Sequence, residues 1–195
     1  ARLIFNEHGA IERIEPLERN DAHKIIEQCM IAANVAAANF LLRHKVPALF
    51  RDHLGPDEDR LDQLRQFLGQ LGLQLGGGDN PSPKDFARLL RAVQNRPDRH
   101  LIQTVLLRSM QAADYRPENS GHFGLALDAY AHFTSPIRRY PDLLVHRAIR
   151  HVLAGGKAEN YFMRMDELVA LGEHCSMAER RAEEASRDAL MMLKC

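Results

Sequence analysis

The longest helical pattern in this sequence, from about residue 161 to residue 195, restricts the possible folds more than any other feature. Small and apolar side chains recur there at alternating steps of three and four residues, which traces one continuous seam along a helix. The seam consists of Leu168, Leu171, Cys175, Ala178, Ala182, Ala185, Ala189 and Met192. A coiled-coil dimer is one interpretation. Because alanine and cysteine bury little apolar surface, we expect instead a helix that packs closely inside its own domain.

Helix caps, helical spacing and apolar–polar alternation indicate the remaining elements. Asn20 is typical of a helix N-cap, and Ser82 with Pro83 is typical of a cap followed by the first helical position. The expected elements are a hairpin over 3–14, helices over 20–43, 57–73, from 83, over 98–110 and from 141 to the glycines at 155–156, an extended piece at 47–50, and strands between 115 and 132. The chain should therefore combine several long helices with short strands.

Composition and charge exclude several classes of protein. The chain of 195 residues is long enough for one domain or two small ones, and its 45% hydrophobic and 27% charged residues exclude a disordered chain. No apolar run approaches the ~20 residues of a membrane-spanning helix, so we expect no membrane contact. The 26 basic and 26 acidic side chains cancel. Any attraction to nucleic acid must therefore come from a local site.

The cysteines and the chain ends indicate the cellular context. Cys29, Cys175 and Cys195 are few and widely spaced, which argues against a disulfide framework and favours the cytoplasm. The sequence starts without methionine and ends within a helical pattern, so we expect it to be part of a longer protein.

The segment from His122 to Leu143, which includes HFTSPIRRYPDL, has the residues best suited to chemistry. Proline inside a helix costs about 3 kcal/mol, so we expect residues 135–140 to form a tight turn or a first helical turn ahead of Pro141. A helix N-terminus attracts anions, and guanidinium groups match phosphate oxygens. Arg138 and Arg139 are therefore a candidate phosphate clamp.

The helix that follows should carry a polar face. A helical wheel places Val145, Ala148, Ile149 and Val152 on one arc, and Asp142, His146, Arg147 and Arg150 on the opposite arc. The alternative to a clamp is thus a solvated basic face with some ion pairs. Aromatic side chains at 130, 133 and 140 could stack on bases, although core packing is their commoner role.

Metal binding and nucleophilic catalysis have no support in the residue pattern. No histidine pair has HxxxH spacing, no cysteine–histidine spacing is typical of zinc, and Ser135 lacks the GxSxG context of a hydrolase. We expect no metal site in this chain. His122, His132 and His146 either contact RNA or substrate or serve as hydrogen-bonded structural residues.

The segment from His122 to Arg147, with HFTSPIRRYPDLLVHR, closely resembles the signature region of the ribonuclease II and ribonuclease R family of exoribonucleases. The resemblance extends in order over essentially the whole chain. Further matching segments are RNDAH at 19–23, Glu27, CMIAAN at 29–34, PALFR at 47–51 and CSMAERR at 175–181.

The resemblance implies that residues 1–195 are the C-terminal part of the RNB-type catalytic domain, with a mixed, helix-rich α/β fold. Members of this family act processively, hydrolysing single-stranded RNA from its 3′ end to nucleoside 5′-monophosphates. The resemblance also implies Mg²⁺, held by aspartates in the first half of the domain and so by ligands outside this chain. The flanking OB-type domains are likewise outside it. We expect a cytoplasmic monomer that acts on RNA and not on DNA.

The same resemblance implies roles for particular residues. Arg138, in the Ser-Pro-Ile-Arg motif, corresponds to the family's phosphate-contacting catalytic arginine, which would neutralise charge while two Mg²⁺ ions activate water. The implied RNA contacts are Glu27, Tyr130, His132, Thr134, Ser135, Arg139, His146 and Arg147. Gln28 stands where the family commonly has glutamate. The isolated chain should be inactive, and the alternative function is a noncatalytic helical RNA-binding or scaffold module.

Overall fold

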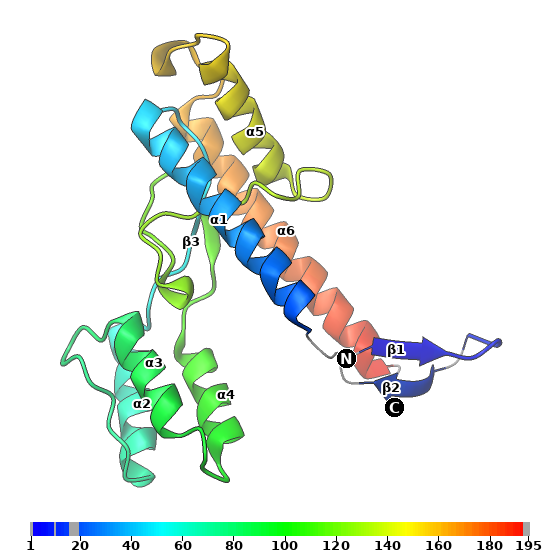
Figure 1. Ribbon diagram of the computed structural model, residues 1–195, viewed down its shortest axis with the longest axis vertical. Coiled ribbons are helices and arrows are strands. Elements are labelled where there is room, and N and C mark those ends of the chain that lie inside the picture. The colour runs from blue at the N-terminus through cyan, green and yellow to red at the C-terminus, as the bar shows by residue number, and fades with distance from the viewer. Residues whose placement is uncertain (1, 10, 16–19, 193–195) are drawn as a thin grey trace.

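The computed structural model describes residues 2–9, 11–15 and 20–192, and it is a mixed α/β chain dominated by helices (Figure 1). The element bounds are β1 Arg2–Phe5, β2 Ile11–Glu15, α1 Asp21–His44, β3 Phe50–Asp52, α2 Glu58–Gln70, α3 Pro83–Ala92, α4 Arg99–Ser109, β4 Asp114–Arg116, the 3₁₀ helices η1 Phe123–Leu125 and η2 Ala158–Asn160, α5 Tyr140–Leu153 and α6 Met165–Met192. The expected helices all form. The predicted contribution of Cys195 to α6 lies outside the described residues.

The described residues form two separate hydrophobic cores. One lies where α1, α5 and α6 pack around β3 and β4, and the other lies inside the α2–α4 unit at the opposite end of the molecule (Figure 1). The 3₁₀ helix η1 packs on the second core, because Phe123 lies edge-on against Phe86 of α3 with ring centroids 5.3 Å apart. The adjoining His122 ring lies 5.3 Å from the ring of Tyr130, which is hydrogen-bonded to Asn34 of α1. The segment singled out in the sequence therefore starts at the junction of the two cores.

Helix α1 begins where the sequence predicts. Asn20 accepts the His23 N–H at 2.9 Å and completes a capping box, which satisfies amides that the first helical turn leaves open. The buried residues Asn34, Ala37, Ala38 and Leu41 lie in the second half of α1, and the small side chains among them allow close approach to α5. Residues 21–30 are exposed.

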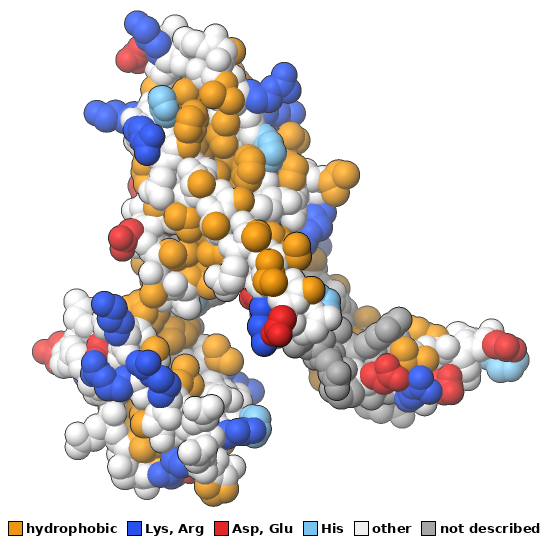
Figure 2. Space-filling view, in the orientation of Figure 1, with side chains coloured by type: hydrophobic (Ala, Val, Ile, Leu, Met, Phe, Trp, Pro, Cys, Tyr) orange, Lys and Arg blue, Asp and Glu red, His pale blue; other side chains and the backbone are white. Residues whose placement is uncertain are grey.

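Helix α1 corrects the expectation that no apolar stretch in the chain is long enough to span a membrane. With a mean hydropathy of 1.5, α1 is long and apolar enough, by length and composition alone, to cross a membrane. Hydrophobic side chains are visible along it in Figure 2, and Ile25 and Ile26 are 62% and 61% exposed. Core helices of folded proteins pass the same test, and the second half of α1 has that role here.

Helix α6 packs on strand β4 through residues with small side chains. A Cβ atom on Gly172 would lie 2.5 Å from the Tyr115 carbonyl oxygen, so the close approach requires glycine. Ser176 Oγ accepts the Tyr115 N–H at 2.9 Å and donates to the Gly172 carbonyl oxygen at 2.8 Å. The prediction of a closely packed helix is thus confirmed only as far as Ser176. Most residues beyond it are exposed.

The strands form two small antiparallel sheets. Strand β1 pairs with β2 as the predicted hairpin, and β3 pairs with β4 so that Arg51 lies opposite Tyr115. Of the strands expected between 115 and 132, β4 forms at the start of that range, whereas over 123–130 the expectation is wrong. Local hydrogen bonds from Leu125 N–H to His122 and from Ala126 N–H to Phe123 close η1 instead. Side-chain alternation could not reveal this turn, which also places Ala126 at φ +55°.

Candidate functional site

The turn that carries the two adjacent arginines is fixed by local hydrogen bonds. The Ser135 carbonyl oxygen accepts the N–H groups of Arg138 and Arg139 at 3.2 and 3.1 Å. Asp142 Oδ1 accepts the Ser135 N–H at 2.7 Å and an Arg139 Nη2 hydrogen at 2.8 Å. The chain then enters α5 at Tyr140. The prediction of a tight turn ahead of Pro141 is confirmed.

Asp142 does not lie on the solvated arc where the helical wheel places it. Its side chain is fully buried, at 0% exposure. Residues 134–139 fold back against the first turn of α5, and a wheel takes no account of a neighbouring loop. The expected polar arc therefore contains a buried, hydrogen-bonded carboxylate at its N-terminal end.

The two arginines of the turn differ in charge balance. Arg139 is largely buried and forms an ion pair with Asp142, with an N–O distance of 2.8 Å. Arg138 is exposed, and within the described ranges no hydrogen bond or ion pair engages its guanidinium. Arg138 therefore presents an uncompensated positive charge beside a locally neutral pair.

A cavity of about 990 Å³ lies between this turn and α6. Its lining includes Tyr115, Arg138, Arg139, Cys175, Glu179 and Arg187. The small seam residues Ala178 and Ala182 also line it. The middle of the predicted seam thus borders a cavity instead of a packed core.

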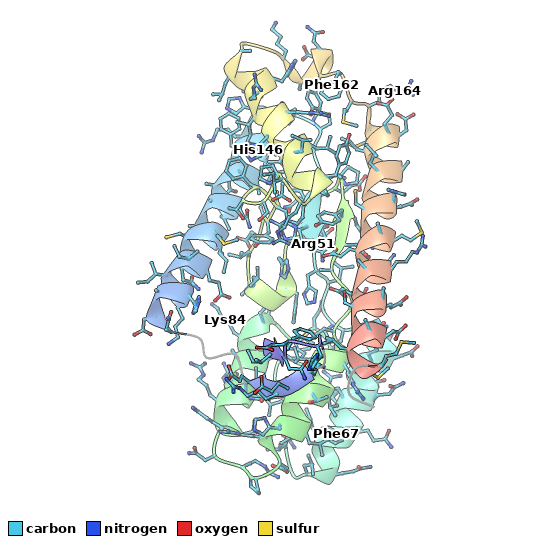
Figure 3. The ribbon with its side chains drawn as sticks, turned by 90° about the vertical axis from the view of Figure 1, so that its right-hand side faces the viewer. Arg51, Phe67, Lys84, His146, Phe162 and Arg164 are labelled. Carbon is cyan, nitrogen blue, oxygen red and sulfur yellow. The ribbon has the colours of Figure 1, made fainter. Side chains whose placement is uncertain are left out.

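A second cavity, of about 320 Å³, lies on the α1 side and brings Glu27 and Tyr130 together with Arg139. Arg139 lines both cavities. Buried Asn34 ties α1 to this region, because its Nδ2 donates to Tyr130 Oη and its Oδ1 accepts the Phe133 N–H, each at 2.9 Å. In Figure 3, α1 and α6 stand on opposite sides of the molecule.

Arg51 lies between these two helices (Figure 3) and has contacts that we did not predict. Its guanidinium lies 2.6 Å from the Glu179 carboxylate and 4.5 Å from the centre of the Tyr115 ring. Arg51 and Glu179 occur in segments quoted for the family resemblance, PALFR and CSMAERR respectively. The family resemblance of the two segments was the signal that could have pointed to these residues. It does not reveal that Arg51 and Glu179 pair, because they are 128 positions apart in the sequence.

The histidines considered for RNA contact have internal partners. His132 Nδ1 lies 2.8 Å from Tyr115 Oη, and burial, with nearby Arg139, lowers the pKa of His132 to about 3. His146 stacks on Phe133 with centroids 4.2 Å apart, and its Nε2 lies 2.9 Å from the Phe133 carbonyl oxygen. These contacts favour the structural interpretation. The RNA contacts of His132 and His146 stay predictions.

His122 is also engaged internally. Its ring stacks on that of His53 with centroids 4.9 Å apart, and its Nδ1 accepts the Leu125 N–H. Burial, with His53 adding a smaller effect, lowers the pKa of His122 to about 4.

The remaining predicted RNA contacts occupy different settings. Ser135 and Thr134 lie in the turn, and Thr134 Oγ1 is buried without a hydrogen-bond partner among the described residues. Arg147 is exposed on α5 and is not among the lining residues of either cavity. The structure therefore gathers Glu27, Tyr130 and Arg139 with Arg138 nearby and leaves Arg147 apart.

The described residues offer no metal centre. Across residues 2–9, 11–15 and 20–192, no group of three or more histidine, cysteine, aspartate or glutamate side chains could hold a metal ion. The Mg²⁺ implied by the family resemblance, with ligands outside this chain, stays a prediction.

Comparison with known proteins defines the class to which this fold and turn belong. The RNB domain family matches residues 1–155, and the chain belongs to that family. It is 56% identical over 203 residues to ribonuclease R of Escherichia coli K12, covering 100% of this chain and 25% of that protein. The chain thus spans about a quarter of the length of this relative.

Solved structures show the same architecture over nearly all of the chain. The apo form of Mycoplasma genitalium RNase R has a TM-score of 0.90 at 26% identity, covering 98% of this chain and 31% of that one. The same enzyme in complex with ribose-methylated single-stranded RNA has a TM-score of 0.87 at 26% identity, with the same coverage. The likeness therefore includes α6, which lies beyond the region matched by the family.

Proposed function

We propose that this chain is the C-terminal part of the catalytic domain of a processive, hydrolytic 3′-to-5′ exoribonuclease that releases nucleoside 5′-monophosphates. The observation that carries the proposal is the uncompensated Arg138 guanidinium at the edge of the larger cavity, beside an Arg139 already paired with Asp142. Membership of the RNB domain family, and the RNA bound to a solved relative, support it.

The turn is suited to stabilising a phosphoryl group under attack. Hydrolysis forms a bond from a water oxygen to phosphorus and breaks the P–O3′ bond, while a proton passes from the water to the leaving oxygen. Negative charge increases on the non-bridging oxygens in the transition state. The planar guanidinium of Arg138 can donate two parallel hydrogen bonds to them.

The walls of the two cavities are suited to holding the RNA strand. Tyr140 borders the larger cavity, is 44% exposed and offers aromatic surface for bases, whereas the Tyr115 ring is buried in the same wall beneath Arg51. Glu27 and Tyr130 border the smaller cavity. Because Arg139 lines both cavities, we propose that the strand passes along it, with its 3′ end directed toward Arg138.

We also propose that divalent metal ligands of the parent protein lie outside the described residues, so that the isolated chain cannot turn over RNA. The expected cytoplasmic location, monomeric state and indifference to DNA stay predictions. A noncatalytic RNA-binding module is the second candidate function, and the lack of a metal-binding group in the described ranges is the observation that favours it.

The discriminating experiment compares the full-length parent protein with residues 1–195 on single-stranded RNA labelled at the 5′ end and, separately, at the 3′ end. The proposal predicts that the parent protein, with Mg²⁺, releases 3′-labelled mononucleotide at once and shortens 5′-labelled RNA without releasing internal fragments. The isolated chain should release nothing above a mock purification. A parent protein that binds RNA without cleaving it under these conditions would favour the noncatalytic module.

A further inference from the structure

We propose that Asp142 is a positioning residue for Arg138. Asp142 fixes the backbone of the turn of residues 135–139 and balances the charge of Arg139, so that of these two arginines Arg138 is the one with an unpaired guanidinium among the described residues, carried on a restrained backbone. The proposal rests on the proposed function, because it concerns how the phosphate-contacting arginine is held.

The contacts of Asp142 span the turn. Its Oδ1 accepts a hydrogen bond from the Ser135 backbone at 2.7 Å and another from the Arg139 side chain at 2.8 Å. These partners stand at the two ends of the turn, and Arg138 lies between them. One buried carboxylate therefore restrains both ends of the segment that carries Arg138.

Charge balance makes this restraint specific to a carboxylate. A buried ion is stable only when it is paired and hydrogen-bonded, and Asp142 and Arg139 provide this for each other. If Asp142 were neutral, the Arg139 guanidinium would lose its ionic partner and gain freedom to leave its position. The turn would then lose a restraint on the backbone from which the Arg138 side chain extends.

Around the turn, three polar atoms are buried without hydrogen-bond partners among the described residues. They are Asp142 Oδ2, Arg139 Nε and Thr134 Oγ1. Such atoms are unfavourable in a folded protein and are typical of sites shaped for function. A carboxylate placed only to cap α5 would not require this arrangement around it.

The test is a double-mutant cycle in the full-length parent protein, measured as the single-turnover rate at saturating RNA. Asp142→Asn keeps an oxygen that can accept the Ser135 N–H but removes the charge. We expect Asp142→Asn to lower the rate by about 10-fold or more, with a change in Kd below about 3-fold. In a protein that already carries Arg138→Ala, the same substitution should lower the rate by less than about 2-fold, because its effect acts through Arg138.

A merely structural role predicts a different pattern. Equal fold-changes in the two backgrounds, or a wild-type rate for Asp142→Asn, would overturn the proposal. Thermal melting checks that each variant is folded at the assay temperature. If Asp142→Asn is not folded, Asp142→Glu replaces it in the same cycle, since the longer side chain keeps the charge but displaces the turn. Failure of the proposed function is distinguishable, because the unmodified parent protein would then release no mononucleotide.

Discussion

The Arg51 guanidinium lies 2.6 Å from the Glu179 carboxylate and joins β3 to α6 at the wall of the larger cavity. The two side chains are 13% and 34% exposed, so solvent screens this ion pair only in part. A second pair, Arg180 with Asp114 at 2.7 Å, joins α6 to β4 at a more exposed position. The contributions of a partly buried and of a more exposed ion pair to the stability of α6 packing can therefore be compared.

We expect Arg51→Met to lower the free energy of unfolding by about 1–3 kcal/mol, because it removes the ion pair and the cation–π contact with Tyr115. Arg180→Met should change it by less than about 1 kcal/mol. Thermal melting of the full-length parent protein, compared at one protein concentration, measures both. A larger effect for Arg180 would contradict this view of how α6 is attached.

Gly172→Ala should destabilise the protein, because the added Cβ would meet the Tyr115 carbonyl oxygen at 2.5 Å and push α6 away from β4. Overpacking of this kind costs about 1–3 kcal/mol. Gly69→Ala in α2 is the control, since no atom lies within 4 Å of the added Cβ. Alanine should stabilise that helix by about 0.5–1 kcal/mol. Melting curves of the two variants should therefore shift in opposite directions.

The stability of the protein should fall as the pH decreases below about 6.5. Burial lowers the pKa of His132 from 6.5 to about 3, so the unfolded chain takes up a proton in this range and the folded chain does not. His132 thus contributes stability that is present above pH 6.5 and is lost as the pH falls toward 3.

Melting temperatures of the wild type and of His132→Gln, measured from pH 7.5 to pH 4.5, test this dependence. The variant should lose less stability than the wild type across the range. His8→Gln, at an exposed position in the β1–β2 turn, is the matched control for the loss of a histidine elsewhere in the chain. Parallel curves for His132→Gln and the wild type would show that His132 is not the group responsible.

Local signals made much of the fold predictable. Asn20 and Ser82 both act as helix caps, and Pro83 stands in the first turn of α3, because capping depends on only a few neighbouring residues. The alternation over 123–130 misled because it carries no information on backbone turns. The turn ahead of Pro141 was predictable for the same local reason as the caps.

Long-range features of the site were out of reach. The helical wheel placed Asp142 in solvent, since burial by a preceding loop leaves no mark on helical periodicity. The contact of Arg51 with Glu179 joins residues 128 positions apart, so no local pattern could reveal it. The exposure of the second half of α6 was equally hidden, because a seam of small residues can border a cavity as well as a core.

The role of Arg138 is the central claim, and its substitution in the full-length parent protein tests it most directly. Arg138→Ala should lower the single-turnover rate at saturating RNA by about 10²-fold or more, with a much smaller change in Kd, because the guanidinium acts as charge develops. Arg138→Lys should recover little, since a point charge cannot replace the planar fork. Arg150→Ala, at an exposed position near the end of α5, should affect only Kd. A near wild-type rate for Arg138→Ala, or an effect confined to Kd, would contradict the account.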